Sequence, residues 1–112
     1  MSSISKSEID TIFGKTFKDF RIKNRLTQEQ LSEKLNISLK YISRIENGSG
    51  GIKTQTLINY MNILGISPNS LFKEFIKNDK IKQEIALSEQ LQELSDEKIQ
   101  FILKMINEIK NI

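Results

Sequence analysis

The chain has 112 residues, which is room for one domain with a short appendage, and 38% of them are apolar, enough to form a core. It contains no His and no Cys, so His or Cys metal sites, disulfides, thiol nucleophiles and Ser-His-Asp triads are excluded. Residues 1–66 carry ten basic and six acidic side chains, a net charge of +4, whereas residues 67–112 carry seven and eight, which points to an anionic partner for the first part.

The first half of the chain contains three segments with apolar residues at helical spacing, each preceded by a hydroxyl residue that can cap a helix. Ser7 and Ser38 stand at two of these positions, and Thr27 forms a Thr-x-x-Gln capping box with Gln30. Asn36 tolerates the left-handed conformation and predicts a tight turn between the second and third segments. The predicted helices span residues 8–24, 28–35 and 38–46.

The middle of the chain continues with two further helices. Thr54 is the predicted cap of a helix that Gly65 ends. Ser67 followed by Pro68 is a cap with proline at the first helical position, and this helix is expected to continue through Ile76. The apolar residues expected to form the buried face of the earlier of these two helices are Leu57, Ile58, Met61 and Leu64.

The C-terminal part begins with a break at Asn78-Asp79 and has a sparse apolar pattern over residues 80–94. Ser95, followed by two acidic residues, then opens a last helix that is rich in large apolar side chains. One stripe of this helix consists of Ile99, Ile102, Ile106 and Ile109. Such a helix needs burial on more than one side, so we expect a domain over 8–77 and a separate helical segment over 80–112.

Residues 27–48 have the pattern of a helix-turn-helix, in which apolar side chains hold two short helices at a wide angle. The polar face of the second helix then projects outward and fits the major groove of DNA, which admits one α-helix. Without the segment Tyr41–Gly48, a plain helical hairpin would explain the same spacing. The outward positions are Ser38, Lys40, Tyr41, Ser43 and Arg44.

On these residues the chain from about 12 to 76 resembles the Cro/phage-repressor (Xre-like) helix-turn-helix family. The resemblance implies an all-α fold, a five-helix lambda-repressor-like domain followed here by a C-terminal helical extension. It also implies that the protein binds operator DNA as a dimer. The matching segments are Phe17–Arg21, Thr27–Leu31, Tyr41–Gly48 and Leu57–Phe72.

The resemblance also implies roles for single residues. Gln28 matches a glutamine that contacts phosphate and steadies the first base-reading residue, and Asn47 matches a phosphate contact. Arg21 and Glu46 match a pair that forms an internal salt bridge. Glycines replace the basic residues that relatives often carry after the second helix of the motif, and Lys53 is expected to supply that contact instead. The expected DNA-binding residues are Gln28, Ser38, Leu39, Lys40, Tyr41, Ser43, Arg44, Asn47 and Lys53.

The function implied is that of a transcriptional regulator, a repressor that binds a palindromic operator as a homodimer and needs no cofactor. No apolar run reaches the length of a membrane span and the first residues lack a signal core, so we expect a cytoplasmic protein with double-stranded DNA as its partner. The segment 80–112 is expected to dimerise, although it can instead pack on its own domain or bind a regulatory protein.

Two other functions fit the same domain. A controller of a restriction–modification or toxin–antitoxin module uses the same domain, and a protein-interaction module can keep the fold without binding DNA. An enzyme lacks a catalytic constellation here. The segment Gly14-Lys15-Thr16 imitates the end of a phosphate-binding loop, but position 9 is Ile and no strand precedes it, so these residues are expected on the surface of a helix.

Overall fold

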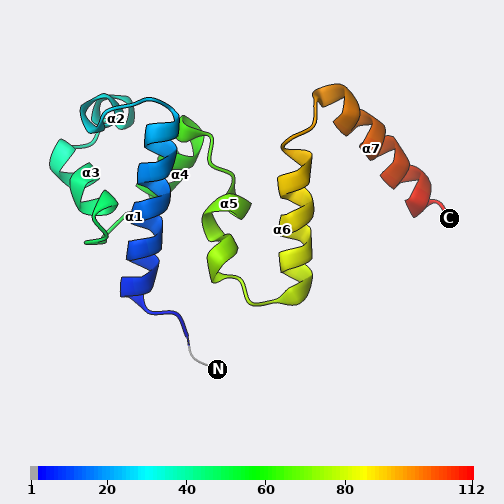
Figure 1. The fold of residues 1–112 in the computed structure, drawn as a ribbon, viewed down its shortest axis with the longest axis horizontal. Helices are drawn as coiled ribbons and strands as arrows, with labels where there is room; N and C mark the ends of the chain where they lie inside the picture. The colour runs from blue at the N-terminus through cyan, green and yellow to red at the C-terminus, as the bar shows by residue number, and fades with distance from the viewer. Residues whose placement is uncertain (1–2) are drawn as a thin grey trace. The chain divides into compact units, whose positions relative to one another are not determined.

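The computed structural model describes residues 3–112. Within that range the chain forms seven α-helices, one short 3-10 helix and no strand, so the predicted all-α class is confirmed (Figure 1). The helices fall into two compact units, one that ends at Phe75 and one that comprises Ile76–Ile112. The elements are α1 (Lys6–Lys23), α2 (Gln28–Leu35), α3 (Leu39–Glu46), α4 (Thr54–Leu64), α5 (Pro68–Phe72), η1 (Lys73–Phe75), α6 (Asp79–Leu91) and α7 (Asp96–Lys110).

The first unit is built around aromatic side chains from α1. The ring of Phe17, which is fully buried, lies 4.3 Å from that of Tyr60 on α4, centroid to centroid. Phe13 meets the rings of Phe72 and Phe75 edge to face. These contacts join α1 to α4, α5 and η1, and the inner faces of α2 and α3 complete the core. Its buried members are Phe13, Phe17, Leu31, Leu35, Ile42, Ile45, Tyr60, Leu64, Ile66 and Leu71.

Helix α1 begins two residues before the predicted start, and Ser7 is not its cap. The cap is Ser5, whose side chain accepts a hydrogen bond of 3.1 Å from the backbone N–H of Glu8. Ser7 lies inside the helix, where its carbonyl accepts from the hydroxyl of Thr11. Ser5 and Ser7 each have an acidic residue three positions later, so the spacing of a capping box does not distinguish between them.

Helix α4 differs from the prediction in both its cap and its buried face. Its cap position is Lys53, with no hydrogen bond from that side chain, and Thr54 is the first helical residue. Tyr60 and Thr56 are buried, whereas Ile58 is exposed. The buried face is therefore turned away from Ile58, because the large ring of Tyr60 fills the space opposite Phe17.

The helix after Pro68 is shorter than expected. Ser67 caps it as predicted, accepting from the N–H of Ser70, but α5 ends at Phe72 and continues only as the 3-10 turn η1. Such tightened turns are common at the ends of helices. Asn78 then caps α6 by accepting from the N–H of Ile81.

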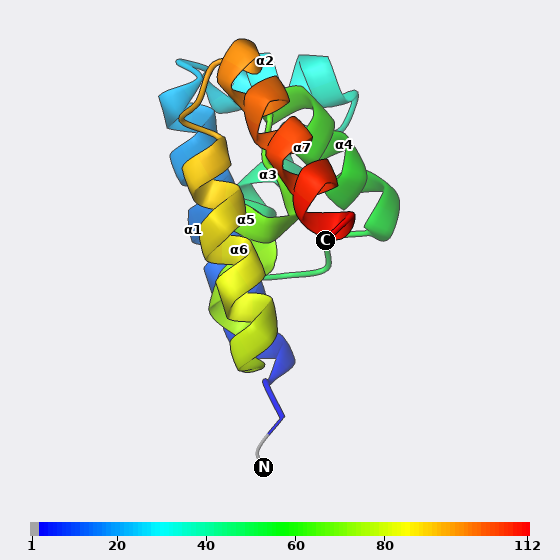
Figure 2. The same cartoon turned by 90° about the vertical axis from the view of Figure 1, so that its right-hand side faces the viewer.

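The second unit consists of α6 and α7 joined by a short elbow (Figure 2). Ser95 caps α7 as predicted, and the acidic residues Asp96 and Glu97 occupy its first turn, where the partial positive charge of the helix end favours them. Among the helices of residues 3–112, none combines the length and the apolar character that crossing a membrane requires.

Gly14 sets the distance between α1 and α3, and its predicted surface position is wrong. The residue is buried, and a Cβ atom at this position would lie 2.5 Å from the carbonyl oxygen of Ile45 and 2.9 Å from that of Glu46. Real side chains do not tolerate such contacts, so only glycine lets α1 approach the C-terminal end of α3 this closely. Because Gly14 lies in the middle of α1, the resemblance to a phosphate-binding loop has no structural basis.

Candidate nucleic-acid interface

The helix-turn-helix forms through the local signals that the sequence carries. Thr27 and Gln30 make both hydrogen bonds of the predicted capping box at the start of α2. Asn36 ends α2 in the left-handed conformation, with φ 54° and ψ 46°. Ser38 then caps α3 by accepting from the N–H of Tyr41. These bonds satisfy backbone groups at both ends of the turn and hold α3 in place.

Helix α3 separates sharply into a buried face and an exposed face. Ile42 and Ile45 are in the core, and Glu46 is buried beside them. The opposite face carries two cations, Lys40 and Arg44, with no acidic residue among its exposed positions. The exposed candidates on α3 and at its two ends are Ser38, Leu39, Lys40, Arg44 and Asn47.

A buried ion pair ties α1 to the end of α3. Arg21 donates from Nε to Glu46 Oε2 at 2.7 Å and from Nη2 to Oε1 at 2.9 Å. Its Nη1 donates to the carbonyl oxygen of Leu26 at 2.8 Å. The two side chains are only 11% and 3% exposed, and the hydrogen bonds to Glu46 raise the pKa of the Arg21 guanidinium. The pair therefore holds the C-terminal end of α3 against α1 and the start of α2.

Gln28 connects this ion pair to the recognition helix. Its Nε2 donates to Glu46 Oε1 at 3.1 Å, and its Oε1 accepts from the hydroxyl of Ser43 at 2.9 Å. Both ends of the amide are used, so its orientation is determined by its partners. Ser43 and Gln28 are half-buried, and they contribute to holding α3 in place as well as lying at its surface.

Tyr41 does not lie freely on the outer face. It is half-buried against the core, and its hydroxyl donates to the carbonyl of Gly51 and accepts from the N–H of Lys53. These two bonds, of 3.1 and 3.0 Å, bring the loop after α3 back to the helix. Tyr41 thus places Lys53 beside α3, although the two residues are twelve positions apart.

The glycine loop keeps close to the exposed end of α3. Asn47 Oδ1 accepts from the N–H of Ser49 at 3.0 Å, which orients the side chain of Asn47. Gly51 has φ +83°, and a Cβ atom there would lie 3.7 Å from Arg44 Nη2. The guanidinium of Arg44 therefore lies next to the loop at Gly51.

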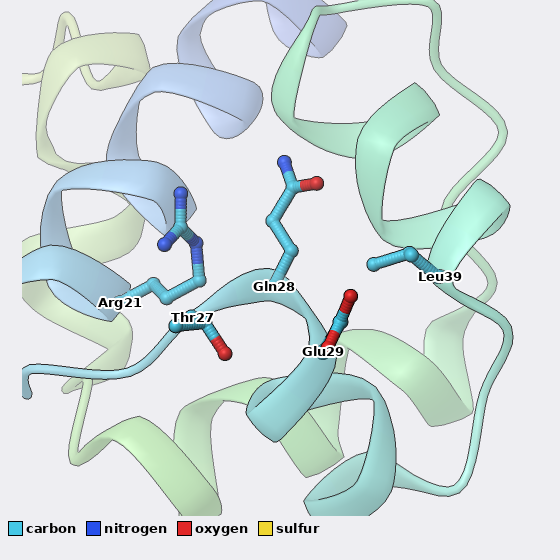
Figure 3. Close-up of a pocket in the computed structure, with 5 residues that line it drawn as sticks. All are labelled: Arg21, Thr27, Gln28, Glu29 and Leu39. Atoms are coloured by element: carbon cyan, nitrogen blue, oxygen red, sulfur yellow. The ribbon is translucent and has the colours of Figure 1, made fainter.

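A hollow of about 460 Å³ lies between the N-terminal ends of α2 and α3 (Figure 3). Arg21 reaches it from α1, and Gln28 and Leu39 approach it from the two helices of the motif. No group of three or more acidic side chains that could hold a metal ion occurs within residues 3–112. The residues that line the hollow include the charged side chains of Arg21 and Glu29 and the amide of Gln28.

Two comparisons with known proteins agree with this geometry. The helix-turn-helix family matches residues 17–71. The chain is also 32% identical over 106 residues to an uncharacterized HTH-type transcriptional regulator, YqaE, of Bacillus subtilis (strain 168). That match covers 87% of this chain and 91% of the relative. The chain belongs to the helix-turn-helix family of transcriptional regulators.

In this helix-turn-helix regulator, the DNA-binding motif comprises α2, the turn at Asn36 and α3. Sequence reasoning correctly paired Arg21 with Glu46, but it missed that Glu46 also receives a hydrogen bond from Gln28. It also missed the role of Tyr41 in closing the glycine loop. Neither contact has a signal in spacing, because each joins residues that only the packing of the helices brings together.

Proposed function

We propose that this regulator represses transcription by binding a palindromic operator as a homodimer, with α3 of each copy in the major groove. The observation that carries the proposal is that contacts with the rest of the domain hold α3 in place. Its inner face is in the core, its C-terminal end is held by the buried Arg21–Glu46 pair, and its outer face carries Lys40 and Arg44. A rigid helix with exposed cations matches the shape and charge of the groove.

The proposed DNA contacts divide into base-reading residues on α3 and phosphate-contacting residues next to it. Arg44 and Lys40 are suited to a guanine edge, which Arg contacts with two hydrogen bonds. Leu39 is suited to a thymine methyl group. Ser38 adds a hydroxyl group at the N-terminal end of the helix, and the half-buried Ser43 adds one in its middle.

Gln28, Asn47 and Lys53 contact the phosphate backbone in this proposal. The Gln28 amide nitrogen has two donors, and Glu46 takes one of them. Asn47 uses its oxygen for Ser49, so its amide nitrogen serves the phosphate. Because phosphate contacts carry no sequence information, changes at Gln28 are expected to weaken binding to all DNA sequences alike.

Selection of bound sequences from a random DNA pool at about 150 mM salt tests the function, because nonspecific phosphate binding is suppressed there. We expect an inverted repeat with half-sites about 34–36 Å apart, one turn of DNA. A pool with no enriched sequence would contradict the proposal and favour a protein-interaction module.

Replacing Arg44 by Ala tests the orientation of α3. We expect binding to the selected operator to weaken by about 1–3 kcal/mol, with a relaxed preference at one base pair. Lys15→Ala, which removes an exposed cation from α1, is the matched control, and its affinity for the operator should fall much less. Equal affinities of Arg44→Ala and the unaltered protein would show that α3 does not face the bases as proposed.

A further inference from the structure

Within the second unit, α7 carries large apolar side chains that are exposed. Ile106 and Ile109 are 40% and 62% exposed, and Leu103 and Met105 are exposed to a similar degree. Ile99 and Ile102, nearer the elbow with α6, are half-buried. A helix with this much exposed apolar surface gains free energy when a partner covers it.

The apolar residues of α7 follow the heptad spacing of a coiled coil. Ile99, Ile102, Ile106 and Ile109 are separated by three, four and three residues, which are the spacings of the two core positions. Leu103 and Met105 flank this seam on its two sides. The charged residues Glu97, Lys104 and Glu108 lie outside the seam.

The charges at the two ends of the seam select the direction of the partner. In an antiparallel pair, Ile99 faces the partner's Ile109 and Ile102 faces the partner's Ile106. This register places Asp96 beside the partner's Lys110, and symmetry repeats the pair at the other end. The same register brings Leu103 opposite its own counterpart on one side of the seam, so charge and apolar residues agree on one alignment.

A parallel pair loses this complementarity. Lys98 would then lie opposite the partner's Leu103, and Met105 opposite the partner's Lys110. Asp96 and Lys110 would be separated by about 21 Å along the axis, too far to interact. In parallel coiled coils, Ile at both core positions also favours assemblies larger than a dimer.

We propose that α7 pairs antiparallel with α7 of a second copy of this chain, through the seam Ile99–Ile109 and two Asp96–Lys110 ion pairs. The inference deepens the proposed function, because it rests on the homodimer proposed there and assigns its interface. The seam extends for only about 15 Å, at the small end of specific interfaces. The dimer should therefore dissociate at chain concentrations on the order of micromolar, and binding to two half-sites should stabilise it.

The first test replaces one residue of the seam and one outside it in the full chain. Ile106→Glu places two charges in the apolar seam, and we expect the dimer dissociation constant from sedimentation equilibrium to rise by at least about tenfold. Phe101→Ser is the matched control, since Phe101 is 64% exposed but lies off the seam, and it should leave the constant unchanged. Three results would overturn the proposal. The unaltered chain could stay monomeric, Ile106→Glu could stay dimeric, or both variants could weaken the dimer equally.

The second test exchanges the charges at the ends of the seam. Asp96→Lys and Lys110→Glu each place like charges together at both ends, so each variant alone should dimerise about tenfold more weakly. An equimolar mixture should form a heterodimer that recovers this loss, because every end pair is then opposite in charge. Each substitution also changes a charge at the end of its own helix, and that change is still present in the mixture. Recovery of dimer affinity therefore cannot come from a change in helix stability. A mixture as weak as the single variants would overturn the antiparallel register.

Both tests measure assembly without DNA. The proposed DNA recognition is read separately, from binding of each variant to a single half-site. Loss of assembly with normal half-site binding supports the α7 interface, whereas a dimer that binds no DNA would contradict the proposed function and leave the interface intact.

Discussion

At the scale of single residues, Glu46 has a central position because it accepts hydrogen bonds from both Arg21 and Gln28. Arg21 lies on α1, Gln28 lies at the start of α2, and Glu46 itself lies on α3. One carboxylate therefore links three helices. Gln28 in turn accepts from Ser43 on α3. Removing Glu46 therefore affects the stability of the domain and the geometry of its DNA-binding face together.

Glu46→Ala should lower the free energy of unfolding by about 3–5 kcal/mol, because Arg21 is left buried without its charged partner. Urea unfolding measures this loss. Glu33→Ala, which removes an exposed carboxylate from α2, should change stability by no more than about 0.5 kcal/mol. A Glu46→Ala variant as stable as Glu33→Ala would show that the pair is not a structural element.

Tyr60→Phe should raise stability at neutral pH, since the buried Tyr60 hydroxyl has no hydrogen-bond partner within residues 3–112 and leaving such a group unsatisfied costs about 1–3 kcal/mol. Burial, reinforced by the charge of Glu46, raises the pKa of this hydroxyl in the folded protein. Above about pH 10 the unfolded chain ionises while the folded one stays protonated, so stability falls as pH rises.

The part of the decrease in the free energy of unfolding that is due to Tyr60 approaches about 1.4 kcal/mol per pH unit, and it should be absent in Tyr60→Phe. Urea unfolding of both proteins between about pH 8 and pH 11 measures it. Parallel stability curves for the two proteins across this range would contradict the assignment.

At the scale of secondary-structure elements, the close approach of α1 to α3 depends on Gly14. The contact at this point involves backbone carbonyl oxygens of α3, which cannot move aside as the end of a flexible side chain can. The motif is thus held at its C-terminal end by two independent contacts, one steric at Gly14 and one ionic at Glu46.

Gly14→Ala should destabilise the protein by about 1–3 kcal/mol, because the overlap of its Cβ with Ile45 and Glu46 exceeds the gain of up to about 1 kcal/mol from better helix propensity. Thermal unfolding compares it with Lys15→Ala, which puts alanine at the adjacent exposed position and should be neutral or slightly stabilising. If the two variants melt at the same temperature, α1 and α3 are farther apart than the structure has them.

At the scale of the whole molecule, our proposals give the two units different roles. The first unit binds DNA, and the second joins two copies of the chain. The first unit carries the positive charge and the DNA-binding motif, and the second carries α7 with its exposed isoleucines. One α3 covers only one half-site, so a regulator of this size gains operator affinity by joining two copies.

Ile106→Glu should therefore weaken binding to an operator with two half-sites by at least about tenfold, while leaving binding to a single half-site unchanged. Titrations of both DNA fragments by fluorescence anisotropy at one salt concentration measure the two affinities. Equal weakening on both fragments would indicate that the substitution damages the first unit instead of separating the copies.

The sequence predicted most of the local structure, because local signals determine it. The capping box at Thr27, the left-handed turn at Asn36 and the caps Ser38, Ser67 and Ser95 all form as their residue types imply. It failed for the start of α1, where two serines compete, and for the cap of α4.

The candidate site was predictable in composition but not in its internal contacts. The exposed cations of α3 follow from helical periodicity alone. The link from Gln28 to Glu46 and the closing of the loop by Tyr41 do not, since they join residues eighteen and ten positions apart.

By itself the sequence determined the all-α class, the helix-turn-helix and the family, because capping, turn formation and apolar spacing act within a few neighbouring residues. Only the tertiary structure decided that Gly14 is buried, that Tyr60 and not Ile58 fills the core, and that Gln28 holds α3. These features depend on which helix faces meet and how closely, and that is determined by packing between segments distant in the chain.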